Sequence, residues 1–396
     1  MKQYLLVVLL LTSSLAGCLG GSDEQSGELE AVFTFTPADN IREGQTINFD
    51  GSSSITYGSV TYKWDFEADG SVDKTGKTVT WVYAAAGNYE VILSISDGIK
   101  TVSQTRPITV VAATAQPPTA DTGSFSSNDD CDGDSASEGN YYLFYICEYD
   151  KDATSSSERK ISATTTVELD GSESTAAADD YIAKWEWDIN LKFDADGDGD
   201  MKNDPDFTGE TFSWPDLAPG EYKIQLTVTA GGGMTDTDTT TVYVNYVGKW
   251  SEFEMAPNST QQQEPEDLDF EITVTYDADL GNTIRKAQSE LIYPQEDQDG
   301  ACASDSVPCR NQLDLYGFNS SNRDSKDEDS QNTSSEGLDN RQDGDCPSEM
   351  DCIWLSITGY TFSENEDKDG QWTISVRNEN VRDIAVESLV IRLVYK

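Results

Sequence analysis

The sequence predicts an all-β protein built from tandem β-sandwiches, and three observations support this fold class. Short runs rich in Val, Ile, Thr and aromatic residues recur along the chain, separated by Gly, Asn, Asp and Ser, as in antiparallel sandwiches. No long stretch after the N-terminus repeats its apolar residues with helical periodicity. Motifs of one segment return in a later one, which indicates a duplicated domain. Since a domain usually spans about 150 residues, the 396 residues predict two or three domains.

The N-terminus has the pattern of a secretion signal that ends in a cysteine. Lys2 precedes an apolar run at residues 4–11, and the small residues of Leu15-Ala16-Gly17 precede Cys18. This order resembles the lipobox of prokaryotic lipoprotein signal peptides. The resemblance implies that residues 1–17 are removed and that Cys18 carries a diacylglyceryl group, which anchors the chain to a membrane. A spanning helix needs about 20 apolar residues, more than this run offers, so we expect the rest of the chain outside the cytoplasm.

A tether and a first sandwich come after this cysteine. Residues 18–28 contain Gly, Ser and acidic residues with few apolar side chains, which is typical of a flexible linker. Residues 29–112 contain short strand-like runs at regular spacing, which predict an antiparallel sandwich. These runs are residues 31–36, 46–49, 60–66, 78–83, 89–96 and 105–110.

Residues 117–247 repeat the motifs of this first domain. Asp50-Gly51-Ser52 returns as Asp170-Gly171-Ser172, and Trp64-Asp65 returns as Trp187-Asp188. Each repeated motif stands at the end of a strand-like run, where a turn or a core residue is expected. We expect the two tryptophans of the second motif to lie in the cores of two related sandwiches.

The shared motifs resemble those of polycystic kidney disease (PKD) domains. In both copies a tryptophan stands six residues before a Gly-x-Tyr strand entry, Trp81 before Gly87 and Trp214 before Gly220. The resemblance covers both domains and implies two immunoglobulin-like sandwiches, of the kind found in cell-surface proteins and as non-catalytic modules of secreted hydrolases. The positions of Trp81 and Trp214 relative to the core stay open at this point.

Six cysteines remain after Cys18, an even number in a chain expected outside the cytoplasm. No Cys-x-x-Cys spacing and no histidine are present, so we predict disulfides rather than zinc sites. The last four cysteines can also pair across one another, for example Cys302 with Cys352. Nearest neighbours give the simplest pairing: Cys131 with Cys147, Cys302 with Cys309, and Cys346 with Cys352.

The second domain carries an insertion at about residues 124–160, which holds Cys131 and Cys147. We expect a hairpin pinned by their disulfide. The aromatic run at residues 141–146 either covers an edge of the core or forms an exposed contact patch.

An acidic loop at residues 194–206 comes after the Trp187 strand. Alternating Asp and interspersed Gly allow successive carboxylates to surround one hard cation, because Ca²⁺ binds six to eight oxygen atoms. The loop resembles the start of an EF-hand loop, but Pro205 stands where that loop has its bidentate Glu. We predict an irregular Ca²⁺ site, with a solvated loop as the alternative. The candidate ligands are Asp194, Asp196, Asp198, Asp200, Asp204 and Asp206.

Residues 248–396 form a third domain of a different kind. The segments Leu313-Asp314-Leu315-Tyr316 and Gln371-Trp372-Thr373-Ile374 resemble jelly-roll domains of the P-domain and pre-peptidase C-terminal types, which implies another β-sandwich. Residues 319–345 are charged and rich in Ser and Asn, which predicts a disordered loop. The strand-like runs are residues 268–276, 290–293, 312–316, 352–360, 371–376 and 387–395. Glycosylation sequons begin at Asn258, Asn319 and Asn332.

The composition excludes several functions. The chain has 26 Lys and Arg against 73 Asp and Glu, a net charge of −47, and no histidine. Such a surface repels nucleic acids, attracts cations and suits a salty medium, where screening weakens self-repulsion. Without histidine the chain cannot build a Ser-His-Asp triad or the usual zinc hydrolase site. No Gly-rich phosphate loop stands between a strand and a helix, so no nucleotide site is expected.

These observations predict a non-catalytic surface lipoprotein that binds a polysaccharide or a surface protein and is stabilised by Ca²⁺. A structural spacer of the cell envelope is the first alternative. A glycosidase that uses two carboxylates is the second, since that mechanism needs no histidine.

Overall fold

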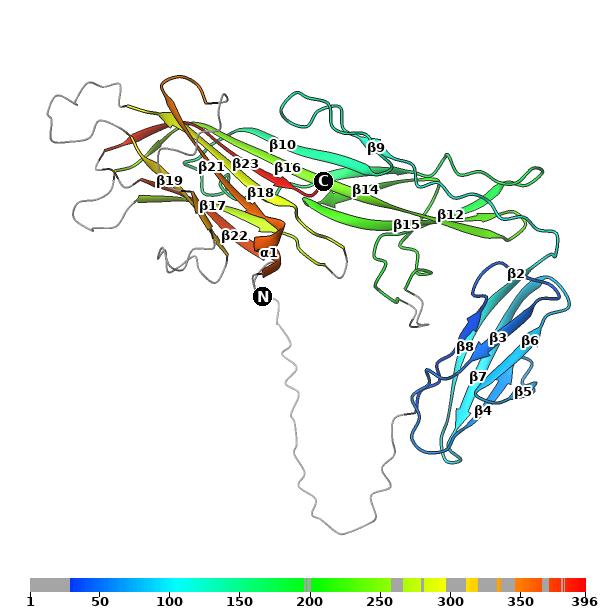
Figure 1. Cartoon of the computed structure of the whole chain (residues 1–396). Helices are drawn as coiled ribbons and strands as arrows, with labels where there is room; N and C mark the ends of the chain where they lie inside the picture. The colour runs from blue at the N-terminus through cyan, green and yellow to red at the C-terminus, as the bar shows by residue number, and fades with distance from the viewer. Residues whose placement is uncertain are drawn as a thin grey trace, which may run out of the picture. The chain divides into compact units, whose positions relative to one another are not determined.

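A computed structural model of the chain describes residues 29–195, 197, 201–257, 266–278, 281–296, 311–319, 333–335, 346–364, 370–378, 380 and 382–396 (Figure 1). These residues form β-strands and one short helix, α1 (Gly359–Glu364). They divide into two compact units. The first unit extends to Ile108, apart from residues 37–45 and 82–87, and the second contains those two segments and runs from Thr109 to Lys396. No helix among the described residues is long and apolar enough to cross a membrane.

The first sandwich has one sheet of three strands and one of five. Its core is aromatic, because Phe33, Phe49, Trp64 and Phe66 are buried and their ring centroids lie 4.8 to 6.4 Å apart. Alternation along the strands produces this core, since every second residue points to the same face. The smaller sheet has the order β1 (Thr34–Thr36), β3 (Thr46–Asp50), β6 (Thr78–Val82), and the larger has the order β2 (Ile41–Arg42), β8 (Thr101–Val111), β7 (Gly87–Ser96), β4 (Thr61–Asp65), β5 (Lys74–Thr75).

The second unit is organised around a sheet of nine strands. Seven of them lie in the order β13 (Phe207–Thr208), β12 (Ile182–Asp188), β15 (Gly220–Ala230), β16 (Thr235–Met255), β23 (Ile384–Val394), β18 (Lys286–Pro294), β21 (Met350–Thr358). The other two, β9 (Phe125–Ser126) and β10 (Tyr142–Lys151), join through the pairing of β10 with β16. Two smaller sheets complete the unit: β11 (Thr165–Asp170) with β14 (Thr211–Leu217), and β17 (Glu266–Val274), β22 (Gly370–Asn378), β19 (Leu313–Asn319), β20 (Thr333–Ser335).

The long strand β16 joins the second PKD-like sandwich to the C-terminal one. Its first half pairs with β15, up to Val244, and its second half pairs with β23, from Tyr246 onward. The predicted domain boundary between residues 247 and 248 therefore falls inside a strand. One hydrophobic cluster runs through both sandwiches, from Trp187 to Trp372, with Trp250 of β16 between them in sequence. The two sandwiches consequently share one core.

The insertion at residues 124–160 is not the hairpin that the sequence predicts. β10 pairs in parallel with both β9 and β16, with Tyr142 opposite Phe125 and Val242. A parallel partner is possible because the chain loops back between β9 and β10 instead of turning directly. The prediction that the aromatic run covers the core is confirmed, since Tyr142, Leu143 and Ile146 are buried.

The C-terminal region differs from the sequence prediction in two details. β20 lies within residues 319–345, where a disordered loop is predicted, and pairs with β19 from Thr333 to Ser335. The predicted strand at residues 352–360 ends at Thr358, because α1 begins at Gly359. The remaining predicted strands of this region match β17, β18, β19, β22 and β23 to within a few residues.

Candidate functional site

The two copies place the tryptophans of their Trp-Asp motifs in the same structural role. Trp64 and Trp187 are 0% exposed, and each donates its indole N–H to the carbonyl of a glycine that ends the next loop. Trp64 Nε1 lies 2.8 Å from the oxygen of Gly76, and Trp187 Nε1 lies 3.0 Å from that of Gly209. The prediction that both are core residues is confirmed. Trp81 and Trp214 are half-buried, so neither forms an exposed stacking platform.

In the first copy the aspartate after the tryptophan is fully used by its own turn. Asp65 is buried and accepts hydrogen bonds from three backbone N–H groups, those of Glu67, Asp69 and Gly70, at 3.3, 3.3 and 2.8 Å. Asp73 closes the turn by accepting the N–H of the residue after Asp65 at 2.7 Å. The turn therefore satisfies both carboxylates without any ligand.

The second copy keeps the two aspartates that frame this turn and inserts the acidic loop between them. Asp206 takes the place of Asp73, because its Oδ2 accepts the N–H of Ile189 at 2.9 Å and its own N–H donates to the Trp187 carbonyl. Asp188 takes the place of Asp65, but only its Oδ1 accepts a hydrogen bond, from the N–H of Asn190 at 2.8 Å. The insertion thus removes the N–H donors that the shorter turn provides.

Asp188 is consequently left with a buried oxygen that has no partner among the described residues. The residue is 4% exposed, and its Oδ2 makes no hydrogen bond. Burial raises the pKa of Asp188, the N–H of Asn190 lowers it, and the negative charges of Asp206 and Asp204 raise it again. A buried, unpaired carboxylate oxygen is costly, and a bound cation would remove that cost.

The predicted Ca²⁺ ligands are only partly described. Asp194 accepts the N–H of Gly197, and Asp204 accepts the N–H of Ala195, both through carboxylate oxygens. A small cavity beside them is lined by Asp204, Asp206 and Phe193, among others. Asp196, Asp198 and Asp200 lie outside the described residues. Within the described part of the chain, no three His, Cys, Asp or Glu side chains are grouped to hold a metal ion.

Two of the three predicted disulfides are present. Cys131 bonds to Cys147 and Cys346 to Cys352, each to its nearest neighbour in sequence. Crossed pairing of the last four cysteines, such as Cys302 with Cys352, is therefore wrong. Cys302 and Cys309 lie outside the described residues, as does the predicted lipid-attachment residue Cys18.

Of the predicted glycosylation residues, the structure describes Asn319 alone. Its side chain is 5% exposed at the end of β19, so the prediction of a glycan there is wrong, because a glycan needs an accessible amide nitrogen. Asn258 and Asn332 lie outside the described residues.

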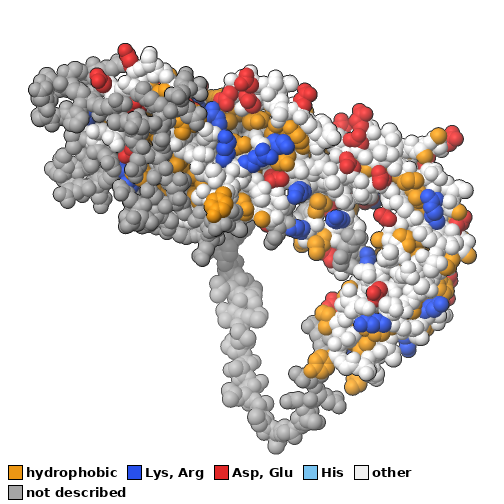
Figure 2. Space-filling model, viewed as in Figure 1, with side chains coloured by type: hydrophobic (Ala, Val, Ile, Leu, Met, Phe, Trp, Pro, Cys, Tyr) orange, Lys and Arg blue, Asp and Glu red, His pale blue; other side chains and the backbone are white. Residues whose placement is uncertain are grey.

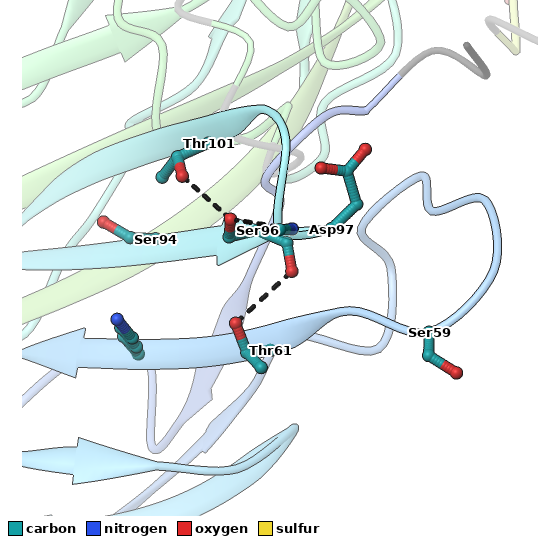
Figure 3. A pocket seen from close by; sticks show the side chains of 8 residues that line it. Ser59, Thr61, Ser94, Ser96, Asp97 and Thr101 are labelled. Carbon is teal, nitrogen blue, oxygen red and sulfur yellow. Dashed lines mark hydrogen bonds between the residues drawn. The ribbon is translucent and has the colours of Figure 1, made fainter. Parts of the chain in front are cut away.

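The first sandwich carries a shallow polar pocket at the end of the β7–β8 hairpin (Figure 3). Thr101 Oγ1 lies 2.9 Å from Ser96 Oγ, and Thr61 Oγ1 lies 3.3 Å from the Ser96 carbonyl oxygen. The one carboxylate, Asp97, accepts the N–H groups of Ile99 and Lys100. These hydrogen bonds, led by the one from Lys100, lower the pKa of Asp97. A single ionised carboxylate with no second acid or base beside it suits a turn rather than catalysis.

A larger, acidic pocket lies on the second sandwich, and its carboxylates also hold backbone. Asp238 Oδ2 accepts both the N–H and the hydroxyl of Thr122, at 2.9 and 2.7 Å. Asp121 accepts the N–H of Gly123, and Asp170 accepts that of Ser172. The glycosidase mechanism needs one carboxyl free to donate a proton and another free to attack, and these three carboxylates are engaged in turns.

Asp188 is the residue that reasoning on the sequence missed as a candidate ligand. The signal was available, because Asp188 repeats Asp65, and the insertion lies between Asp188 and Asp206 instead of between Asp65 and Asp73. Aligning the two copies residue by residue shows that the acidic loop replaces a turn whose backbone donors were needed.

Comparison with known families identifies the two related sandwiches. Residues 31–112 match the model of the PKD domain, and residues 155–244 match that of a second, related PKD domain family. The protein is therefore an all-β chain with two PKD-family domains and immunoglobulin-like sandwich architecture. Its PKD domains and disulfides are features of proteins that work outside the cytoplasm.

Solved structures resemble the chain only distantly. A structure from a study of carbohydrate-binding modules of the β-sandwich superfamily is 14% identical, with a TM-score of 0.20, and covers 92% of this chain and 95% of its own. Bacteroides ovatus SGBP-B, of a mixed-linkage glucan utilization locus, in complex with a mixed-linkage heptasaccharide, is 13% identical, with a TM-score of 0.17 over 93% and 96%. Three N-terminal domains of the bacteriophage RB49 Hoc protein are 11% identical, with a TM-score of 0.24 over 91% and 98%. These scores are too low to carry an argument about function. No curated protein sequence matches the chain.

Proposed function

We propose that the protein is a non-catalytic, lipid-anchored surface protein that binds a polysaccharide or a protein partner outside the cytoplasm. The observation that carries this proposal is the pair of PKD-family domains at residues 31–112 and 155–244. Two disulfides support a place in an oxidising environment. The carboxylates of the two largest described pockets are engaged with backbone N–H groups, which supports a binding role over catalysis.

The lipid anchor is tested by the partition of the full-length protein into detergent. We expect the protein, made with its signal peptide in a host that processes lipoproteins, to enter the detergent phase after Triton X-114 separation. Cys18→Ser should move it to the aqueous phase, because the thiol that accepts the lipid is gone. Ser14→Ala, in the same segment, is the control and should leave the partition unchanged. An unchanged partition of Cys18→Ser would exclude the anchor.

The binding role is tested with the Cys18→Ser protein immobilised and exposed to envelope polysaccharides and envelope proteins. Saturable binding of one component without its cleavage is the expected outcome. A structural spacer is the second candidate, because the shared strand β16 makes one continuous unit from the second and third sandwiches. A spacer would bind nothing saturably, and release of shorter sugars would point to a glycosidase instead.

We further propose that the loop between Asp188 and Asp206 binds Ca²⁺. The unpartnered oxygen of Asp188 supports a cation there, and Asp204 and Asp206 add negative charge beside it. Ca²⁺ accepts carboxylate oxygens in flexible geometries, so an irregular loop can hold it. Millimolar Ca²⁺ should raise the melting temperature of the second unit, and Asp196→Asn with Asp198→Asn should abolish this gain. An identical melting curve with Ca²⁺ and with EDTA would reject the site.

A further inference from the structure

The outer face of the nine-stranded sheet carries a group of cations where the second PKD-family sandwich meets the C-terminal one. β15 begins at Gly220 opposite Val244 of β16, and β23 reaches Leu393 opposite Tyr246. The start of β15 and the end of β23 therefore meet beside the same stretch of β16. Lys223, Arg285, Lys286 and Lys396 surround this junction, and we call these four residues the cationic face.

The register of the strands places these side chains on the outer face. Val242, Val244 and Tyr246 of β16 point into the core, so Tyr243 between them points outward. Lys223 pairs with Thr241, two residues before Tyr243 and on the same side. Lys286 pairs with Val394, next to the inward-facing Leu393. The opposite face of the sheet is buried, so these cations are accessible on one side only.

Two tyrosines form the centre of the cationic face. Lys396 Nζ lies 4.2 Å from the ring centroid of Tyr141 and 5.1 Å from that of Tyr243. The two rings meet edge to face at 5.8 Å. Arg285 lies close enough to influence the charge of Tyr243. Both tyrosine rings are half-buried, so each presents part of its surface to solvent.

The cationic face stands out against the charge of the whole chain. The chain has 73 acidic and 26 basic residues, yet four cations surround one acid here, Glu221. The carboxylate of Glu221 is engaged with Thr283, from which it accepts the N–H and the hydroxyl at 3.2 and 3.0 Å. No ion pair between described residues involves Lys223, Arg285 or Lys396. By contrast Arg392, further along the face, is paired with Asp132 and Glu290.

Figure 2 shows this arrangement on the surface, where Lys and Arg side chains gather around hydrophobic ones over the region of β10, β16 and the C-terminus. Aromatic rings bind the apolar faces of sugar rings, and Lys and Arg bind carboxylate or sulfate groups through charge-assisted hydrogen bonds. The combination on one flat sheet face fits an extended chain that carries both kinds of group.

We propose that the cationic face binds an anionic polysaccharide, one that carries carboxylate or sulfate groups along its length. This inference rests on the proposed binding function and names the class of its ligand. A slender polymer suits a protein of net charge −47, because at physiological ionic strength charges act over only about 8 Å. A single glycan strand then meets the local cations, whereas a membrane or an acidic protein would face the acidic surface around them.

The test measures binding of polygalacturonate, dextran sulfate and uncharged dextran to the Cys18→Ser protein by calorimetry at about 0.15 M salt. We expect at least one of the two anionic polymers to bind and dextran not to bind. Lys223→Glu with Arg285→Glu should weaken that binding at least tenfold. Lys63→Glu with Lys100→Glu, two exposed lysines of the first sandwich, makes the same change in net charge and should alter binding less than twofold. Tyr141→Ser should weaken binding without lowering the melting temperature, because the ring is half-buried on the surface.

Several outcomes would overturn the inference. Equal losses in the two charge-reversed variants would show that net charge matters and the cationic face does not. Binding of single-stranded DNA or of phosphatidylglycerol vesicles with the same dependence on Lys223 and Arg285, and of neither polysaccharide, would assign the face to another polyanion. If an envelope component binds saturably and Lys223→Glu with Arg285→Glu leaves that binding intact, the proposed function stands and this inference fails.

Discussion

The two PKD-family sandwiches share the Trp-Asp motif but differ in the turn after it and in how their last strands end. In the first copy a short turn satisfies Asp65 completely, and the last strand, β8, ends at Val111. In the second copy the turn is replaced by the acidic loop, and the last strand, β16, continues to Met255 as part of the next sandwich. The comparison teaches that a duplicated core can be kept while the turns and strand ends change its role. The first copy is a separate unit, and the second is fused.

The largest expected effect separates these two units by their unfolding. Removing a buried tryptophan costs about 3 to 5 kcal/mol, and Trp64 and Trp187 are matched in burial and hydrogen bonding. Trp64→Ala should lower only the transition of the first sandwich in differential scanning calorimetry. Trp187→Ala should lower a second transition that includes the C-terminal sandwich, because both belong to one hydrophobic cluster.

Near-ultraviolet circular dichroism monitors the C-terminal tryptophans, such as Trp372, through the same melt. Three separate transitions, or an unshifted C-terminal signal in Trp187→Ala, would contradict the fusion of the second and third sandwiches.

The next effect concerns the insertion, which the first copy lacks. The Cys131–Cys147 disulfide spans 16 residues, and closing a loop of about this length stabilises the folded state by about 3 kcal/mol. Cys131→Ala with Cys147→Ala should therefore shift the chemical unfolding midpoint of the second unit strongly. The shorter Cys346–Cys352 loop, with a separation of 6, should cost about 2 kcal/mol when its cysteines are replaced in the same way. The opposite order of these two losses would show that the insertion contributes little to the fused unit.

A smaller effect tests the parallel contact between β10 and β16. Glu148 of β10 accepts the hydroxyl of Tyr246 at 2.6 Å and pairs with Lys151 at 2.6 Å. Burial alone would raise the pKa of Glu148, but the hydrogen bonds from Lys151 and Tyr246 outweigh it and lower the pKa below 4.5. A carboxyl with a lowered pKa stabilises the fold above its unfolded value and loses this contribution as the pH falls through the folded value. Glu148→Gln should therefore cost about 1 kcal/mol at pH 7.

The same variant should match the parent protein once the pH lies below the lowered pKa, which urea unfolding at several pH values measures. Glu210→Gln, at an exposed site, is the control and should change the free energy of unfolding little at any pH. A loss that persists unchanged in acid would mean that packing, and not the charge of Glu148, holds β10.

The sequence predicted the strands and cores well because both rest on local alternation. Every strand-like run of residues 29–112 overlaps an observed strand, and the two motif tryptophans are buried as expected. The shared strand could not be predicted in the same way. Its residues 247 and 248 look like any strand interior, and pairing with β23 depends on residues more than a hundred positions away. The same reason hides the parallel partner of β10, because periodicity gives a strand but no direction or neighbour.

The candidate site divides along the same line. The acidic loop was recognisable from its Asp and Gly spacing, yet Asp188 was not, since its importance comes from donors that are missing in three dimensions. The cationic face was hidden for a related reason. Lys223, Arg285 and Lys396 are far apart in a chain whose net charge of −47 predicts acidic surfaces, and only the register of the sheet brings them together.

The smallest expected effect, and the only one whose sign differs between the copies, concerns the two matched aspartates. Asp65→Asn should destabilise the first sandwich by about 1 kcal/mol, because the ionised carboxylate accepts three N–H groups and an amide has one oxygen to offer. Asp188→Asn in EDTA should leave the second unit unchanged or slightly more stable, since it removes a buried charge with an unpaired oxygen beside Asp204 and Asp206. Calorimetric melting temperatures of the two units measure both changes in one sample. With Ca²⁺ present, Asp188→Asn should fall below the parent protein if the ion binds that oxygen. Equal losses in both variants in EDTA would mean that Asp188 is satisfied as Asp65 is, and that the acidic loop does not leave its turn open to a cation.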